Sequence, residues 1–202
     1  MTVELIRHGE TALQREHRYQ GRLDAPLSPE GRAGLKPAPQ CPDRVYVSQL
    51  LRARQTAALL FPQAEQVVVP GLEEMDFGRF EGKNYRELSD DPAYQSWVDG
   101  FCLGPCPGGE SKQEFCARVC AAFEALLQDA WTGGEDSVTI VAHGGTQMAV
   151  MERFAIPQKD YFDWHLESGQ GYRAQANWGE NGLTLTLLAV TDYRRETGPR
   201  EL

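Results

Sequence analysis

The chain has 202 residues, of which 41% are hydrophobic, and a formal net charge of −9 at pH 7. Its length and hydrophobic content suffice for one packed core, so we expect a single domain over residues 1–202. The negative charge argues against nucleic acid or an anionic membrane as a partner, because the protein would repel either one. A small anionic ligand would need a local cluster of positive side chains.

Targeting signals and cysteine content predict the compartment. No apolar run approaches the roughly 20 residues of a membrane-spanning helix, and no basic region followed by an apolar segment marks the N-terminus. Five cysteines, an odd number in a chain of this size, argue against a disulfide framework. We therefore expect a cytoplasmic protein. The sequence specifies no oligomeric state.

Two pairs of closely spaced cysteines could bind zinc or form a local disulfide. Cys116 and Cys120 are four residues apart in a predicted helix, and Cys102 and Cys106 lie just upstream. Packing of small residues in the helix explains the first pair, and zinc sites more often use a C-x₂-C spacing. We expect no metal.

In chain order, short runs rich in β-forming residues alternate with segments of helical spacing. We expect strands at 3–6, 44–48, 66–69, 137–142 and 183–190, and helices at 50–60, 110–130 and 145–154. This alternation predicts an α/β fold, a three-layer α/β/α sandwich with a mostly parallel central sheet. The apolar runs in 44–48 and 137–142 lack polar alternation, which is typical of central strands.

Two further segments lie outside this pattern. Residues 82–109 are rich in Asp, Pro and Gly, with a short aromatic helix expected around 94–98. We interpret 82–109 as an insertion beside the site that can act as a lid. The polar residues 193–202 are expected to fray.

Three predicted strands end in polar groups suited to one anion. Arg7 and His8 end the first strand, Arg52 begins the helix after the second, and His143 and Gly144 follow the fourth. Ligands of open α/β sheets bind beyond the carboxyl ends of the strands. Guanidinium groups match phosphate oxygens, and free N–H groups at a helix start favour negative charge. The pattern predicts a phosphoryl site.

The expected chemistry is attack on phosphorus by one neutral imidazole, which would give a phosphohistidine. The leaving oxygen then needs a proton, and a carboxylic acid near the same edge could supply it. The candidate carboxylates lie in "PGLEEMDFGRFEG" and are Glu73, Glu74, Asp76 and Glu81. Spacing alone does not choose among these four.

Five motifs, "LIRHGET", "SQLLRARQTA", "LEEMDFGRFEG", "PGGES" and "VAHGG", occur in that order. From Val3 to about Thr186, the chain closely resembles the histidine phosphatase superfamily, which has the phosphoglycerate-mutase-like fold. The resemblance implies that His8 is the nucleophile. It also implies that Arg7 and Arg52 clamp the phosphate and that His143 contacts it and steadies the transition state.

The same resemblance implies further residue roles. The family's L-x-E-x-x-F-G pattern selects Glu74 as general acid and base. The resemblance also implies that Thr11 and Gly21 lie near the bound phosphate or substrate. Gln14 stands where family members often carry Asn, and its longer amide can still reach a phosphate oxygen. Gly144 is expected to contribute to substrate binding at the start of its helix. The family needs no metal and no organic cofactor.

The activity expected from this resemblance is metal-independent hydrolysis of a small-molecule phosphate ester. The alternatives are a phosphoglycerate mutase and a non-catalytic module that binds a phospho-ligand. Residues 82–109 hold two basic side chains, Lys83 and Arg86, against the acidic Glu87, Asp90, Asp91 and Asp99. That balance favours one phosphate and hydrolysis. The segment "HLESGQGYRAQ" resembles the α-ribazole phosphatase branch, whose substrate is α-ribazole 5′-phosphate.

Overall fold

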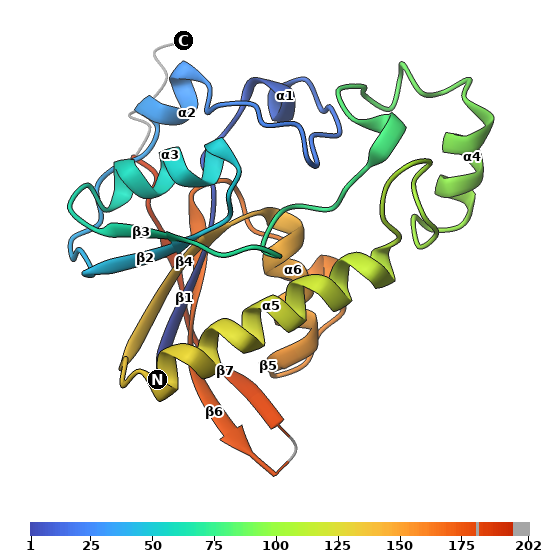
Figure 1. The fold of residues 1–202 in the computed structure, drawn as a ribbon. Helices are drawn as coiled ribbons and strands as arrows, with labels where there is room; N and C mark the ends of the chain where they lie inside the picture. The colour runs from blue at the N-terminus through green and yellow to red at the C-terminus, as the bar shows by residue number, and fades with distance from the viewer. Residues whose placement is uncertain (181, 196–202) are drawn as a thin grey trace.

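The computed structural model describes residues 1–180 and 182–195 (Figure 1). Within them, seven strands form one sheet in the order β3-β2-β4-β1-β6-β7-β5. The strands are β1 (Thr2–Arg7), β2 (Arg44–Val47), β3 (Glu65–Val68), β4 (Ser137–Ala142), β5 (Ala155–Ile156), β6 (Gln170–Gly179) and β7 (Gly182–Asp192). Strand β6 is antiparallel to β1 and β7, and the other neighbouring pairs are parallel. The expected mostly parallel sheet is confirmed.

Helices cover both faces of this sheet. The helices are α1 (Ala12–Arg15), α2 (Pro29–Ala33), α3 (Leu51–Leu60), α4 (Pro92–Asp99), α5 (Lys112–Thr132) and α6 (Gly144–Phe154), and 3₁₀ turns span Gly78–Phe80 and Tyr161–Trp164. Figure 1 shows α3 on one side of the sheet and α5 and α6 on the other. No described helix has both the length and the apolar character needed to cross a membrane.

Alternating side chains of the central strands divide the core into two clusters. Leu5 and Ile140 pack with the residues of α5 and α6, whereas their neighbours Ile6 and Val141 pack with α3. A strand points successive side chains to opposite faces, so a strand covered on both sides needs apolar residues at every position. These two clusters confirm the three-layer sandwich and hold the carboxyl ends of β1 and β4 rigidly together.

Strand β6 was not expected from the sequence. Its residues, "QGYRAQANWG", include no Val, Ile or Thr, the β-branched residues that favour strands. Pairing on both sides stabilises it, because β1 and β7 each hydrogen-bond along it. Tertiary contacts therefore outweigh the low strand propensity of this segment.

The expectation that residues 193–202 fray is wrong for 193–195. Tyr193 is buried, and its hydroxyl donates a hydrogen bond to Glu4 Oε1 at 2.6 Å. The Arg195 backbone N–H donates to the Gly34 carbonyl at 2.7 Å. Residues 196–202 lie outside the described part of the chain.

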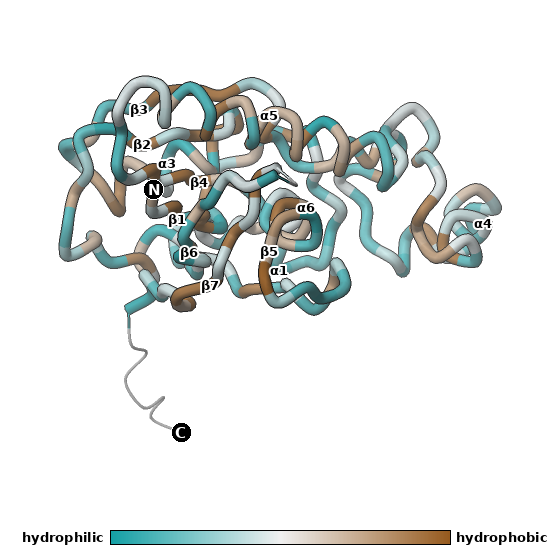
Figure 2. Tube along the Cα trace, turned by 90° about the horizontal axis from the view of Figure 1, so that it is seen from below, coloured by the Kyte–Doolittle hydropathy of each residue, from teal (hydrophilic) through white to brown (hydrophobic). Residues whose placement is uncertain are grey.

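The segment 82–109 carries α4 and lies at the opposite end of the molecule from β3 (Figures 1 and 2). Its expected short helix is present, two residues longer at the start and one at the end. Tyr94 and Trp97 of α4 are buried and pack edge-on against Tyr19, with ring centroids 6.0 and 5.8 Å away. The segment is thus anchored by aromatic contacts, and a lid movement stays a prediction.

Candidate active site

The parallel register of β1 and β4 brings the two predicted histidines together. Arg7 of β1 lies opposite Ala142 of β4, and the His8 backbone N–H donates to the Ala142 carbonyl at 3.0 Å. The imidazole rings of His8 and His143 are consequently 5.1 Å apart between centroids and meet edge-on. Both side chains are buried, with exposed fractions of 4% and 0%.

Hydrogen bonds define which nitrogen of His8 carries the proton. His8 Nδ1 lies 2.7 Å from the Gly9 carbonyl oxygen, which can only accept, so Nδ1 is the protonated nitrogen. The Arg52 Nε–H donates to His8 Nε2 at 3.2 Å. The lone pair of Nε2 therefore faces the Arg52 guanidinium, the group predicted to bind phosphate.

Arg52 is held by backbone carbonyls of the loop that follows α1. Its Nη2 donates to the Gly21 carbonyl at 2.7 Å and its Nη1 to the Leu23 carbonyl at 2.8 Å. Gly21 has a left-handed φ of +44°, and a Cβ there would lie 2.0 Å from Glu81 Oε1. Burial lowers the pKa of Arg52 to about 10, opposed by the negative charge of Glu74. The guanidinium thus stays charged at neutral pH.

Arg7 reaches the same centre from the end of β1. Its Nη1 lies 3.0 Å from His165 Nε2 and also donates to the Leu166 carbonyl. Among the described residues its buried Nε has no hydrogen-bond partner. A Cβ on Gly144 would lie 3.1 Å from that Nε, so glycine permits the close approach of α6. Burial lowers the pKa of Arg7, opposed by Glu74.

His143 immediately precedes α6 and presents a second buried nitrogen without a partner in the described residues. Its Nε2 lies 2.8 Å from Ser48 Oγ at the end of β2. Ser48 Oγ also accepts the Leu50 N–H at 3.4 Å, so its own proton is free for His143 Nε2. This arrangement would leave the proton of a neutral ring on Nδ1, the unpartnered atom.

The structure distinguishes the four carboxylates that the sequence left open. Glu74 Oε2 accepts the N–H of Gly145, two residues after His143, at 3.0 Å. Glu73 pairs with Arg22 and Arg118. Glu81 accepts three backbone N–H groups and Asp76 accepts one. Of these carboxylates, Glu74 is the one bonded to the start of α6, and its negative charge acts on both Arg7 and Arg52.

Thr11 and Gln14 form a local network with α1. The Thr11 hydroxyl accepts the Gln14 N–H at 3.3 Å and donates to Gln20 Oε1 at 2.8 Å. The Gln14 side chain accepts the Thr11 N–H and donates to Ser168 Oγ at 3.2 Å. Both polar groups are thus engaged within the protein, and their contact with a substrate stays a prediction.

Four residues near this centre were not predicted from the sequence: Ser48, His165, Arg22 and Arg118. Ser48 bonds His143 and His165 bonds Arg7. The charge of Arg22 contributes to the lowered pKa of His143, and Arg118 bonds the backbone around Glu74. Their partners lie far away in the chain, so no local motif identifies them. A polar side chain directly at the end of a strand was the one signal available for Ser48.

The pKa values of His8 and His143 are both well below the ordinary value. Burial is the largest cause, followed for both rings by the positive charge of Arg52. Each ring is therefore neutral at pH 7 and gains a proton only when the pH falls below its lowered pKa. A neutral His8 keeps the lone pair on Nε2 that attack on phosphorus requires.

We expect NMR titration of ¹³C-labelled histidines to give midpoints well below 6.5 for His8 and His143, assigned through His8→Asn and His143→Asn. In the urea-unfolded protein the same rings should titrate near the ordinary value of about 6.5. A midpoint at or above 6.5 for His8 in the folded protein would contradict the neutral nucleophile.

The cysteine pairs show no sign of a reactive or ligating role in the part of the chain described. All five thiols are free, and residues 1–180 and 182–195 contain no group of three or more His, Cys, Asp or Glu side chains arranged to hold a metal. Burial raises the pKa of Cys106 and Cys120 to about 12. These thiols are protonated at neutral pH and pack as apolar groups.

Comparisons with known proteins identify the family and the fold. A family model described as histidine phosphatase superfamily (branch 1) matches residues 3–191. The adenosylcobalamin/alpha-ribazole phosphatase of Salmonella typhimurium is 29% identical over 199 residues, covering 93% of this chain and 96% of that protein. The solved alpha-ribazole phosphatase of Shigella flexneri is 28% identical with a TM-score of 0.79, covering 93% and 96% of the two chains.

A second activity is represented among the similar structures. A phosphoglycerate mutase from Thermus thermophilus is 30% identical with a TM-score of 0.65, covering 94% of this chain and 98% of that one. The centre of two arginines, two histidines and one glutamate is thus set in a phosphoglycerate-mutase-like fold. With the family model matching nearly its whole length, the chain belongs to the histidine phosphatase superfamily (branch 1) and is a phosphatase.

Proposed function

We propose that the protein hydrolyses a small-molecule phosphate monoester through a phosphohistidine at His8, without a metal or organic cofactor. The observation that carries this proposal is the orientation of His8. Its Nδ1 is fixed by the Gly9 carbonyl, and its Nε2 faces Arg52. The unpartnered buried donors of Arg7 and His143 lie in the same centre and suit phosphate oxygens.

In the first step, the lone pair of His8 Nε2 forms a bond to phosphorus while the bond from phosphorus to the leaving oxygen breaks. The protonated carboxyl of Glu74 gives its proton to that oxygen, so the product leaves as an alcohol. In the second step, the Glu74 carboxylate takes a proton from water and the water oxygen attacks phosphorus. The P–N bond then breaks, which releases inorganic phosphate and restores His8.

Positively charged and hydrogen-bond-donating side chains stabilise the phosphoryl group during its transfer. Arg7 and Arg52 can each present a planar fork to the equatorial oxygens, and the Nδ1–H of His143 can donate a further bond. All three side chains are held by the protein beforehand, so little reorganisation is needed when charge develops. Preorganised donors of this kind supply most of the catalysis in phosphoryl transfer.

We propose α-ribazole 5′-phosphate as the substrate, supported by the similar α-ribazole phosphatases over 93% of the chain. The charges beside the site suit a leaving group without a second phosphate. Arg22 and Arg118, which lie near Glu74, each pair with both Glu73 and Glu110. Two further arginines are thus neutralised by two glutamates. A bisphosphate-dependent mutase would instead need cations there for a second phosphoryl group.

The catalytic unit in this proposal is one domain over residues 1–202, with 82–109 as its lid. Support comes from the core, because Leu88, Trp97 and Cys106 of this segment belong to the same apolar cluster as Leu5. We also propose a cytoplasmic location, which is supported by five free thiols, since reducing compartments keep thiols unpaired.

A substrate panel tests the proposal. Phosphate release would be measured in EDTA at neutral pH with α-ribazole 5′-phosphate, the two monophosphoglycerates, sugar phosphates and p-nitrophenyl phosphate. We expect α-ribazole 5′-phosphate to exceed the others in kcat/KM by about 100-fold, or about 2.7 kcal/mol. Similar kcat/KM values for all esters would contradict α-ribazole 5′-phosphate as the specific substrate but would still support phosphatase activity. Isomerised phosphoglycerate without released phosphate would favour the mutase. Binding of the phosphate esters without any turnover would favour a non-catalytic module.

A further inference from the structure

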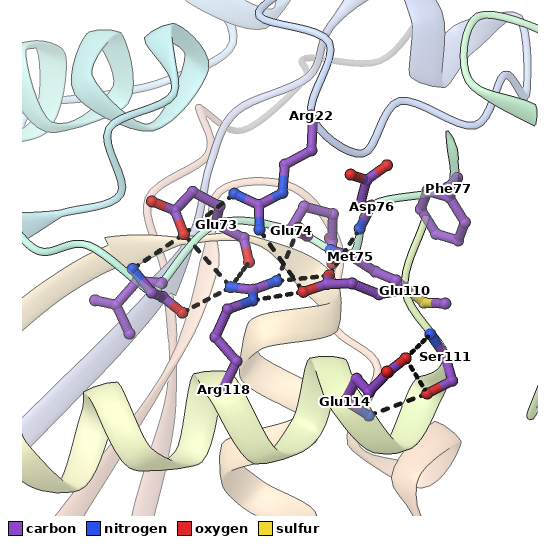
Figure 3. Close-up of polar contacts among 12 residues, drawn as sticks. Arg22, Glu73, Glu74, Met75, Asp76, Phe77, Glu110, Ser111, Glu114 and Arg118 are labelled. Carbon is purple, nitrogen blue, oxygen red and sulfur yellow. Dashed lines mark hydrogen bonds and ion pairs between the residues drawn. The ribbon is translucent and has the colours of Figure 1, made fainter. Parts of the chain in front are cut away.

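The segment that carries Glu74 has no regular secondary structure. Residues 71–77 lie between β3 and the 3₁₀ turn Gly78–Phe80, and none of them belongs to a helix or strand. The strand ladder therefore does not fix the backbone of Glu74. Its position must come from side chains that bond this backbone, and Figure 3 shows them converging from α5 and from the residues before it.

Arg118, on α5, binds this segment at several carbonyls. Its Nη1 donates to the Gly71 carbonyl at 2.8 Å and to the Glu73 carbonyl at 3.2 Å. Its Nη2 lies 3.4 Å from the carbonyl of Glu74 itself. One planar guanidinium thus holds the backbone on the N-terminal side of the general acid, a geometry that the three-proton point charge of a lysine cannot reproduce.

Glu110 completes the arrangement on the other side of Glu74. Its carboxylate accepts Arg118 Nε at 2.7 Å and Nη2 at 2.8 Å, a bidentate pair. Glu110 Oε2 also accepts the Asp76 N–H at 3.0 Å, and the Glu110 N–H donates to the Asp76 carbonyl at 2.9 Å. The residues before and after Glu74 are therefore tied to one ion pair (Figure 3).

The start of α5 is itself well defined, so this ion pair has a rigid base. The Ser111 hydroxyl accepts the Glu114 N–H, and the Glu114 carboxylate accepts the Ser111 N–H, which forms a capping box. Such a cap fixes where the helix begins. Glu110 directly precedes the cap and Arg118 lies two turns into the helix, so both face the Glu74 segment in a fixed register.

Close contacts on both sides restrict the position of the Glu74 carboxylate. It is bracketed by the N–H groups of Met75 and Gly145, each at 3.0 Å, and a Cβ on Gly145 would lie 2.1 Å from Glu74 Oε1. A backbone shift of the 71–76 segment would move the acid relative to the leaving oxygen. A misplacement of about 1 Å can cost about 100-fold in rate.

We propose that Arg118 and Glu110 are positioning residues that hold Glu74 at the distance needed for proton transfer to the leaving oxygen. This inference rests on the proposed function, in which Glu74 is the general acid. It predicts a specific kinetic signature. Loss of the ion pair should slow esters whose leaving group needs a proton and should spare p-nitrophenyl phosphate, whose leaving group departs as a stable anion.

The test compares Arg118→Lys and Glu110→Gln with the unchanged protein, using kcat/KM for an alkyl phosphate and for p-nitrophenyl phosphate. This ratio reports steps up to phosphoenzyme formation, where the leaving group departs. We expect kcat/KM of each variant to fall by about 10- to 100-fold for the alkyl ester and by less than about threefold for p-nitrophenyl phosphate. Retained p-nitrophenyl phosphatase activity would also show that the variant is folded.

The matched control is Arg44→Lys. Arg44 also pairs with carboxylates, at 3.6 Å to Glu65 and 3.5 Å to Glu135, but it lies at the start of β2, at the end of the strand opposite to the site, and its substitution should leave kcat/KM for both esters unchanged. Equal losses on the two esters in both variants, or no loss in either, would overturn the positioning role.

Glu74→Gln, measured alongside, separates this inference from the proposed function. If that variant discriminates between the esters while Arg118→Lys and Glu110→Gln do not, only the positioning role fails. If Glu74→Gln slows both esters equally, the general acid is another group, and the inference falls with that assignment.

Discussion

Replacing His8 by asparagine is expected to reduce turnover of every phosphate ester by at least about 10⁴-fold, because the substitution removes the attacking nitrogen. The asparagine amide can still donate to the Gly9 carbonyl that His8 Nδ1 bonds at 2.7 Å, so the surrounding structure should change little. The measurement is steady-state phosphate release together with trapping of ³²P-labelled enzyme after rapid quenching in base, which preserves phosphohistidine. Label should appear on the unchanged protein and be absent from the variant.

The matched control for this prediction is His17→Asn. His17 is exposed and has a left-handed φ of 53°, a conformation that asparagine adopts readily. Its substitution should leave both turnover and labelling unchanged. Turnover of His8→Asn within tenfold of the unchanged protein would remove the nucleophile assignment, and label retained on that variant would direct attention to His143.

The residues at strand ends were predictable because parallel strands bring their carboxyl ends to one edge. Arg7 is the last residue of β1, His8 and His143 directly follow β1 and β4, and the observed register of these strands places the two imidazole rings 5.1 Å apart. Apolar runs alone indicated which strands are central. For these residues, local sequence and sheet geometry are sufficient, since their positions do not depend on the conformation of any long loop.

The acid was not predictable from spacing alone. Glu73 and Glu74 are adjacent in an irregular segment, and their different environments come from α5 and α6. Arg118 attracts the Glu73 carboxylate, whereas the Gly145 N–H binds the Glu74 carboxylate. From the sequence alone, Arg118 is indistinguishable from an ordinary exposed arginine of a helix, because its partners at 71–74 lie more than 40 residues earlier in the chain. Such long-range pairs leave no periodic signal.

Strand β6 illustrates the same limit for the fold. Its composition predicts no strand, yet it lies between β1 and β7 and is antiparallel to both. The turn before it carries Ser168, which accepts a bond from Gln14. A segment of low strand propensity thus positions the turn that carries part of the polar network around the site, and its pairing with two neighbouring strands stabilises it.

The second large effect is expected for Glu74→Gln and depends on the leaving group. The amide has nearly the same shape but cannot give a proton to an alkoxide. We expect kcat/KM for an alkyl phosphate to fall by about 10²- to 10⁴-fold, the usual contribution of a general acid. For p-nitrophenyl phosphate we expect a loss below about tenfold, because p-nitrophenolate departs without a proton. The measurement is kcat/KM for both esters at one pH.

The same substitution should affect the second step for every substrate. Once the phosphoenzyme has formed, water must lose a proton to attack it, and the Glu74 carboxylate is the proposed base. Rapid mixing of Glu74→Gln with p-nitrophenyl phosphate should therefore give a burst of one p-nitrophenolate per enzyme followed by slow turnover. Glu16→Gln, at an exposed glutamate paired with Arg18, should show neither effect. Equal losses on both esters without a burst would assign proton transfer to a group other than Glu74.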